Sequence, residues 1–359
     1  MIRSITLQNF KSFGELQTVP LEPITLLVGP NNSGKSNFMS VGRFVSNLPT
    51  GQPEDAFDVE GGASFVFHRP LQGDKELRLG WESEQGGYLL QLIRPPGQLK
   101  VAHERISIGE FVLEYPGSPF PFQPVGVAPL LRHAFKPGGR FAPIYQPLVQ
   151  SRLIKLSLQA LRSDSAVVPE PKLTTDGAGL AAVLGLWRGS FLEMCAELDA
   201  FLQKCLPEIR HALVRPAPVP GHLRLWFRQT DGEEFDSEHV SDGVLFFTAL
   251  TMHALDAGAG QLLFIEEPEQ SIHPRRLREL VNLLKELVAS KGCQFVIATH
   301  SPVLLNAFRD EPEAIVLFRR SETGTRVKRL EDIPELRKAL QDAPPGEMLE
   351  SGFFNQEEF

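Results

Sequence analysis

One eight-residue stretch constrains this chain more than any other feature: Gly29–Ser36, with the sequence GPNNSGKS. It matches the pattern G-x-x-x-x-G-K-S/T and follows Ile24–Val28, an apolar run typical of a buried strand. The sequence then predicts a helix from Lys35 to about Leu48, which Pro49 ends. A glycine-rich turn between such a strand and helix directs backbone amides toward the positive end of the helix dipole, where phosphate oxygens bind.

The same pattern assigns roles to side chains. Lys35 is expected to reach the β- and γ-phosphates of ATP, and the Ser36 hydroxyl is expected to bind Mg²⁺. A chance match would occur in about one chain in a hundred of this length, and the strand and helix around the turn make chance a poor explanation. The candidate nucleotide contacts in this segment are Gly29, Pro30, Asn31, Asn32, Ser33, Gly34, Lys35, Ser36 and Asn37.

Two acids end a second apolar run. Leu262–Ile265 reads as a strand, and Glu266 and Glu267 follow it before Pro268. In a parallel sheet they would emerge at the carboxyl edge beside the phosphate loop, where one can hold Mg²⁺ and the other can polarise the attacking water. A solvated acidic turn is the alternative, and it is favoured only if these acids are taken without the phosphate loop.

Two further segments are candidates for contacts with the γ-phosphate. His300 follows the buried run Phe295–Thr299 and can hydrogen-bond the phosphate and the attacking water, although a histidine after a strand is more often structural. Ser241–Gly243 precedes a helix that runs to Leu255. Ser241 or Asp242 can cap that helix, and the free amides of the same turn, including that of Gly243, also suit a phosphate.

Composition limits the remaining possibilities. The chain has 36 basic and 44 acidic residues, a net charge of −8 that argues against a wholly basic, DNA-coating surface. Residues 331–359 carry −6 of that charge, so a basic groove elsewhere stays open; this tail is either loosely ordered or a docking segment. Three cysteines without C-x-x-C spacing exclude a disulfide framework and favour a cytoplasmic setting, and no apolar run is long enough to span a membrane.

The pattern of elements predicts an α/β protein with a mixed sheet, an inserted antiparallel β layer and a helical lobe. Helical spacing begins near Leu148 and lasts to about His211, and Val214–Phe227 reads as a strand. The strand-like runs of the inserted layer are Ser64–His68, Leu77–Trp81, Tyr88–Ile93 and Ile106–Val112, after a loop at 51–61. The expected divisions are a first lobe at 1–147 with the β layer at about 63–122, a helical insertion at 148–228, a second lobe at 229–330 and an acidic tail at 331–359.

Four motifs in one order carry a family resemblance: GPNNSGKS, VSDG, LLFIEEPE and ATHSP, the last containing His300. Together with Leu7–Phe13 and Asp176–Leu184, they resemble the ABC-type P-loop ATPases of the SMC/RecF/OLD-like group. The match is nearest to compact prokaryotic ATPases with an S-D-G signature and an E-E-P-E-x-x-I-H-P run. The chain has no heptad run for a coiled-coil arm, and it ends soon after His300, so a fused TOPRIM nuclease domain is not expected.

The resemblance implies a homodimer that encloses two ATP molecules, each between Gly29–Ser36 of one chain and Ser241–Gly243 of the other. It further implies that Lys11 lies near the phosphates, that Glu266 serves Mg²⁺, that Glu267 is the catalytic base and that His300 is a switch. In this group the metal-binding acid is usually aspartate, which is one methylene shorter than Glu266. Gln146 and Gln150 are candidates for the glutamine between the lobes.

The implied function is an ATP-hydrolysing switch that gates a DNA-associated or effector activity in antiphage defence or DNA repair. The expected effector is a separate protein, with a nuclease as the first candidate, and DNA is a further candidate partner. An ABC transporter subunit is one alternative, but it would carry an L-S-G-G-Q-type signature where this chain has Val240–Gly243. A RecF-like DNA-binding repair protein without an effector is another.

Overall fold

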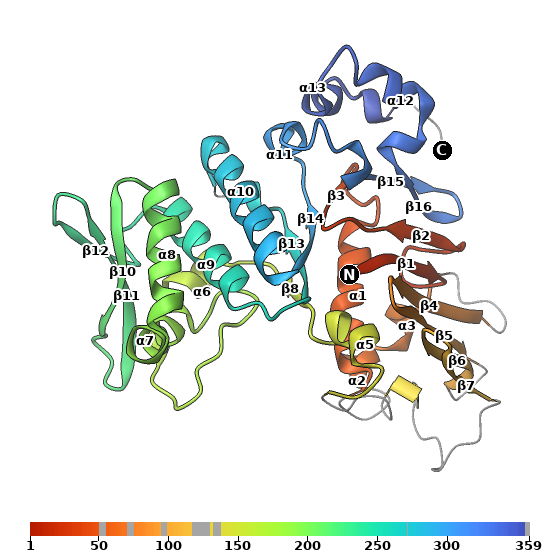
Figure 1. Cartoon of the computed structure of the whole chain (residues 1–359), viewed down its shortest axis with the longest axis horizontal. Helices are drawn as coiled ribbons and strands as arrows, with labels where there is room; N and C mark the ends of the chain where they lie inside the picture. The colour runs from red at the N-terminus through yellow and green to blue at the C-terminus, as the bar shows by residue number, and fades with distance from the viewer. Residues whose placement is uncertain are drawn as a thin grey trace. The chain divides into compact units, whose positions relative to one another are not determined.

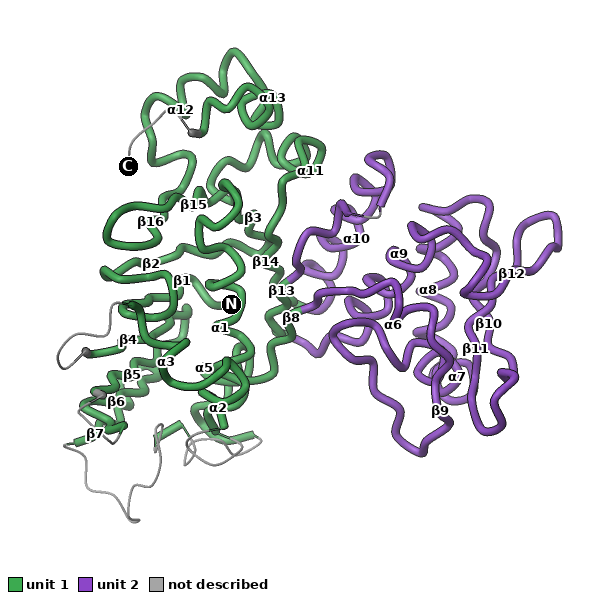
Figure 2. The backbone as a smooth tube through the Cα atoms, turned by 180° about the vertical axis from the view of Figure 1, so that it is seen from behind, with its two compact units in different colours: residues 1–153, 260–264, 292–359 green, residues 154–259, 265–291 purple. Residues whose placement is uncertain are grey.

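The computed structural model describes residues 1–49, 55–69, 75–94, 99–116, 130–131, 138–270 and 272–355. The chain divides into two compact units (Figures 1 and 2). Unit 1 comprises Met1–Leu153, Gly260–Phe264 and Gly292–Phe359, and unit 2 comprises Ile154–Ala259 and Ile265–Lys291. These units are defined by internal packing, and the four-part division expected from the sequence stays a prediction.

The first sheet of unit 1 is antiparallel, with the order β2-β1-β4-β5-β6-β7. Its strands are β1 (Ile2–Gln8), β2 (Gln17–Pro20), β4 (Lys75–Ser83), β5 (Gly86–Arg94), β6 (Lys100–Ile108) and β7 (Phe111–Tyr115). The predicted antiparallel layer is therefore present, and β1 extends it by pairing with β4.

The sequence prediction was wrong at three points in this layer. Ser64–His68 is not a strand, because Ala63–Val66 forms helix α3 and leaves Phe65 exposed. Residues 51–61 are not loop throughout, since Asp55–Asp58 forms helix α2. The run Ile106–Val112 bends at Gly109, whose φ of 54° lets β6 turn into β7. The layer's predicted end near Phe122 lies outside the described residues.

The second sheet is mixed, with the order β16-β15-β3-β14-β13-β8. Strand β3 is parallel to β14 and to β15, whereas β15 and β16 are antiparallel. The five residues of β3 are all buried, as the apolar run predicted. The strands are β3 (Ile24–Val28), β8 (Arg152–Ile154), β13 (Leu262–Glu266), β14 (Gln294–Ala298), β15 (Ile315–Ser321) and β16 (Gly324–Arg329).

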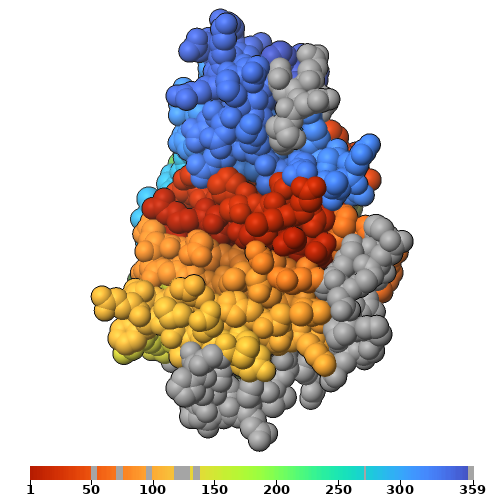
Figure 3. All heavy atoms as spheres, turned by 90° about the vertical axis from the view of Figure 1, so that its right-hand side faces the viewer, coloured from red at the N-terminus to blue at the C-terminus, as the bar shows by residue number. Residues whose placement is uncertain are grey.

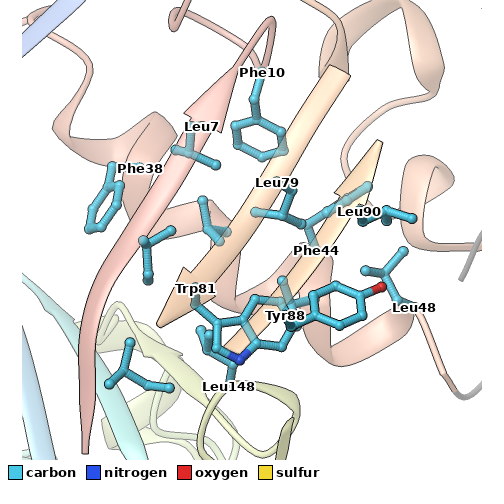
Figure 4. Packing of buried hydrophobic residues seen from close by; sticks show 14 of the residues in the cluster. Leu7, Phe10, Phe38, Phe44, Leu48, Leu79, Trp81, Tyr88, Leu90 and Leu148 are labelled. Atoms are coloured by element: carbon cyan, nitrogen blue, oxygen red, sulfur yellow. The ribbon is translucent and has the colours of Figure 1, made fainter. Parts of the chain in front are cut away.

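Helix α1 (Lys35–Asn47) runs through the core of unit 1 (Figure 4). The Phe38 ring lies 5.8 Å from Phe318 and 6.3 Å from Phe264 of the mixed sheet, measured between centroids. The Phe44 ring packs on Phe10, which follows β1, at 5.6 Å. Burying each such ring contributes about 2–3 kcal/mol. These contacts fix the helix that begins at the phosphate loop, with α5 (Ala142–Val149) beside it.

Unit 2 combines helices with a small antiparallel sheet of order β10-β11-β12, in which β9 also pairs with β11. Val214–Phe227 is therefore two strands of a hairpin and not one strand. The helical spacing near Leu198 and Leu202 is confirmed by their burial in α8. The elements are α6 (Leu158–Arg162), β9 (Ser165–Ala166), α7 (Leu180–Ser190), α8 (Leu192–Cys205), β10 (Ile209–Pro216), β11 (His222–Gln229), β12 (Glu234–Asp236), α9 (Asp242–Leu255), η1 (Pro268–Gln270) and α10 (Pro274–Lys291).

The C-terminal segment is folded as far as the structure describes it, so a loosely ordered tail was the wrong expectation for 331–355. Figure 3 shows the C-terminal part of the chain beside the N-terminal strands on one face. One contact between them comes from β16, just before this segment, where the Val327 amide donates to Gln17 Oε1 of β2 at 3.0 Å. Met348 is buried, and the Gly346 amide donates to Asn306 Oδ1 at 2.7 Å. The helices are α11 (Pro302–Asn306), η2 (Pro312–Ala314), η3 (Leu330–Asp332), α12 (Pro334–Ala339), α13 (Pro345–Glu350) and η4 (Phe353–Asn355). No described helix is long and apolar enough to cross a membrane.

Candidate active site

The phosphate loop joins β3 to α1 through two glycines that no other residue can replace without strain. Gly29 has φ 154°, and a Cβ added there would lie 2.1 Å from the Phe318 carbonyl oxygen. Gly34 has φ 109°, and a Cβ there would lie 2.1 Å from Thr325 Oγ1. The loop is therefore held by the neighbouring strands β15 and β16 as well as by its own turn.

The side chains of the loop fit a nucleotide phosphate chain with Mg²⁺. The Lys35 ammonium lies inside the loop and donates to the carbonyls of Gly29 and Pro30 at 2.6 and 3.0 Å. Ser33 Oγ is buried and makes no hydrogen bond with any residue that the structure describes. Asn31, Asn32 and Ser36 are exposed at the loop tip and the helix start. Because the first amides of a helix have no partner within it, this loop presents donors for phosphate oxygens, with Ser36 exposed for a metal.

Thr325 ties the loop to the turn after β1, although no motif pointed to it. Its hydroxyl donates to the Ser33 carbonyl at 3.0 Å and lies 2.8 Å from Ser12 Oγ, from which it can accept, and its amide donates to the Ser12 carbonyl at 2.7 Å. Lys11, in the same turn, has a left-handed φ of 49°. A non-glycine residue held in that region marks a turn that the surrounding structure determines.

The Lys11 side chain is held by a buried carboxylate. Glu60, which is fully buried at its side chain, accepts from Lys11 Nζ at 2.5 Å and from Arg43 Nε at 2.6 Å. Burial alone would raise the pKa of Glu60, but the hydrogen bonds from Arg43 and Lys11 outweigh it and lower that pKa. Lys11, Glu60 and Asn37 line one hollow of about 330 Å³ in unit 1, so Lys11 lies beside the start of α1.

Glu266 and Glu267 stand at the end of β13, as predicted, and each has a partner in unit 2. Glu266 Oε2 lies 2.9 Å from Lys155 Nζ. Glu267 has a left-handed φ of 46°, and its Oε2 accepts from Gln270 Nε2. This turn lets two consecutive carboxylates face one hollow of about 110 Å³, which both acids, Lys155 and Gln270 line. The described residues contain no group of three or more His, Cys, Asp and Glu that could hold a metal.

His300 follows β14, which lies parallel to β3 in the same sheet. The Thr299 amide donates to the Leu27 carbonyl at 3.1 Å, so the residue before His300 is attached to the strand that leads into the phosphate loop. Ser301 accepts from the Leu304 amide at 3.3 Å and caps α11. Ser301 therefore caps α11, and the sensor role of His300 stays a prediction.

Ser241 takes the N-cap position of α9 without a side-chain capping bond. Asp242 Oδ1 accepts instead from Arg162 Nη2 of α6 at 2.7 Å. Ser241 and Asp242 are both exposed. The start of this helix therefore keeps its amides available, and Asp242 faces a cation.

The role of the two glutamines considered for the link between the lobes stays a prediction. Gln146 lies within α5, and Gln150 is the residue after that helix. The residue that follows β8, the neighbour of β13 in the mixed sheet, is Lys155. Five contacting residues could not be found from the motifs: Glu60, Lys155, Arg162, Gln270 and Thr325.

Two sequence families match the segments described above. Residues 1–60 match the "AAA ATPase domain" family, which covers the phosphate loop. Residues 187–306 match the family described as "AAA domain, putative AbiEii toxin, Type IV TA system", which covers the acidic strand end and His300. These matches support a P-loop ATPase, and its motifs and fold resemble those of the SMC/RecF/OLD-like group.

Curated relatives of this ATPase include the OLD nuclease of Thermus scotoductus, 24% identical over 349 residues, and the Old nuclease of Escherichia phage P2, 24% identical over 357 residues. The matches cover 88% and 85% of this chain. They cover 62% and 57% of the relatives, so the chain spans about three fifths of their length.

Solved structures support the fold of the ATPase. One is an Smc head bound to the C-winged helix domain of ScpA, with a TM-score of 0.56, 15% identity and coverage of 92% of this chain and 98% of that chain. Another is the Smc head from Pyrococcus furiosus with an extended coiled coil, bound to the C-terminal domain of ScpA. Its TM-score is 0.58, its identity is 13%, and the coverage is 95% and 99%.

Proposed function

We propose that this ATPase is a Mg²⁺-dependent switch that closes as a homodimer around two ATP molecules and opens after hydrolysis. Each ATP contacts Gly29–Ser36 of one subunit and Ser241–Gly243 of the other. The observation that carries the proposal is the exposed start of α9, where Ser241 makes no capping bond and Asp242 turns to Arg162. A helix start with free amides and no ligand of its own suits a phosphate that a second subunit brings.

In this proposal the residues of the site have four roles in ATP hydrolysis. Lys35 and the loop amides neutralise the phosphate oxygens, and Lys11 adds a second cation. Ser36 and Glu266 would hold Mg²⁺, which would balance negative charge on the phosphates. Glu267 orients the attacking water and accepts its proton, while His300 contacts the γ-phosphate.

The decisive experiment combines ATP turnover with light scattering of the full chain. Glu267→Gln is expected to lower turnover by about 100-fold or more, because the carboxylate that accepts the proton is lost. With ATP and Mg²⁺ it should accumulate as a dimer. Lys35→Ala is the matched control, and it should abolish both turnover and dimer formation. A Glu267→Gln protein that stays monomeric with saturating ATP would contradict the closed-dimer mechanism.

We further propose that the dimer gates a DNA-associated activity, with a nuclease as its effector, in antiphage defence or DNA repair. The support is that both curated relatives are OLD nucleases. ATP turnover is expected to rise with added DNA, and the stimulation should fall steeply with salt because phosphate contacts release counterions. If the rate of ATP turnover at low salt is the same with and without DNA, the proposed DNA partner is wrong. The proposed ATP-dependent dimer is not affected by that result.

A further inference from the structure

The pairing of Lys155 with Glu266 places a cation on the acid proposed to hold Mg²⁺. Lys155 follows β8, and β8 lies next to β13 in the sheet order. The Lys155 ammonium lies 2.9 Å from Glu266 Oε2. The two side chains differ in exposure, which is 73% for Lys155 and 12% for Glu266. The carboxylate is therefore fixed in the structure, while the lysine reaches it from solvent.

An ammonium and a divalent cation compete for the same carboxylate oxygen. Mg²⁺ requires short, nearly octahedral contacts to oxygen, and a lysine bound to the same carboxylate competes with the metal for its charge and lone pairs. Lysine suits this role because its charge is a compact point on a flexible four-carbon stem. Its exposed pairing contributes little stability, so displacement costs little.

We infer that Lys155 is a positioning residue that occupies Glu266 until Mg²⁺ binds, so that metal binding competes with the lysine. This inference rests on the proposed metal role of Glu266. The neighbouring acid is held differently, because Glu267 accepts from the neutral amide of Gln270. The two carboxylates in the 110 Å³ hollow are thus distinguished by their partners, with the cation placed on the acid proposed for the metal.

The test measures divalent-metal affinity directly, with Mn²⁺ as the probe and a non-hydrolysable ATP analogue present, by the loss of the free Mn²⁺ spin-resonance signal. Lys155→Met should tighten Mn²⁺ binding by about two- to fivefold, the range expected when an exposed ion pair no longer competes. Lys155→Arg keeps the charge and should stay near the wild-type affinity. Lys172→Met, at an exposed lysine of the same unit, is the matched control and should have no effect.

Two further variants separate this inference from the proposed function. Glu266→Gln should weaken Mn²⁺ binding, and adding Lys155→Met to it should then change nothing, since the two residues act on the same oxygen. A general effect of the lysine on folding would appear equally in both backgrounds. If Glu266→Gln binds Mn²⁺ as tightly as wild type, the metal role of Glu266 is wrong and the inference fails with it. If Glu266→Gln weakens Mn²⁺ binding as expected but Lys155→Met leaves it unchanged or weakens it, the inference about Lys155 is overturned. The proposed metal role of Glu266 then still holds.

Discussion

The phosphate loop of unit 1 and the acidic strand end of unit 2 are held in place by different means. Backbone conformation and close packing fix the loop: Gly29 and Gly34 leave no room for a Cβ, and Thr325 bonds to the loop's own backbone. Side chains that can exchange partners hold the acids, with Lys155 on Glu266. The difference indicates a phosphate loop whose shape is set by the backbone, and it predicts that the partners of Glu266 exchange if metal binds there as proposed.

The largest effect on ATP affinity should come from adding a side chain at Gly34. Gly34→Ala adds a Cβ 2.1 Å from Thr325 Oγ1 at a φ of 109°. Strain at such a position costs on the order of 1–3 kcal/mol, and relief would require the loop to shift. ATP affinity, measured with a fluorescent ATP analogue, should fall by about 100-fold, equivalent to about 2.7 kcal/mol.

The chain offers a matched control for this substitution. Gly62 has φ 96°, and a Cβ added there would meet nothing within 4 Å. Gly62→Ala should therefore carry a conformational cost of the same order while leaving ATP affinity near wild type. Equal losses of ATP affinity in the two variants would show that general destabilisation, and not the shape of the loop, is responsible.

A buried acid gives the stability of unit 1 a dependence on pH. Glu104 is fully buried, and burial raises its pKa from 4.5 to about 7, although bonds from Tyr88 and from the Leu130 and Leu131 amides oppose the shift. A carboxyl with a raised pKa in the fold binds its proton more tightly there than in the unfolded chain. Its stabilising contribution is complete below pH 4.5 and is lost as the pH rises through about 7.

Between pH 4.5 and pH 7.5, the free energy of unfolding of the wild type should fall by about 3 kcal/mol more than that of Glu104→Gln. Trp81 lies in this layer, stacked on Tyr88 at 4.3 Å, so its fluorescence can follow urea unfolding once Trp187 and Trp226 are replaced by phenylalanine. Parallel pH profiles for the two proteins would show that the Glu104 pKa is not raised.

Local sequence patterns predicted the central residues of the candidate site, but they did not predict the partners that lie far away in the sequence. The strand–loop–helix at Gly29–Ser36 and the acids at the end of β13 depend on short, periodic runs, and they appear where expected. Glu60, Arg162 and Thr325 contact the site from far along the chain, where no spacing rule applies. Ser64–His68 misled because its alternation reflected one exposed phenylalanine in a short helix and not the two faces of a strand.

The smallest expected effect comes from Asp242, which like Glu266 is held by a side chain that can exchange partners. Its ion pair with Arg162 leaves the Asp242 and Arg162 side chains 49% and 36% exposed, so loss of the pair should change the free energy of unfolding by less than about 1 kcal/mol.

If α9 receives a γ-phosphate from a second subunit, Asp242→Asn removes a repelling charge and should tighten the ATP-bound dimer about two- to fivefold. Arg162→Met leaves Asp242 uncompensated and should weaken it. Light scattering at low and high salt measures the dimer affinity of both variants. Their differences from the wild type should shrink at high salt because salt screens the charges. Shifts in the same direction would show that the pair supports the fold of α6 and α9 and has no electrostatic role at the dimer site.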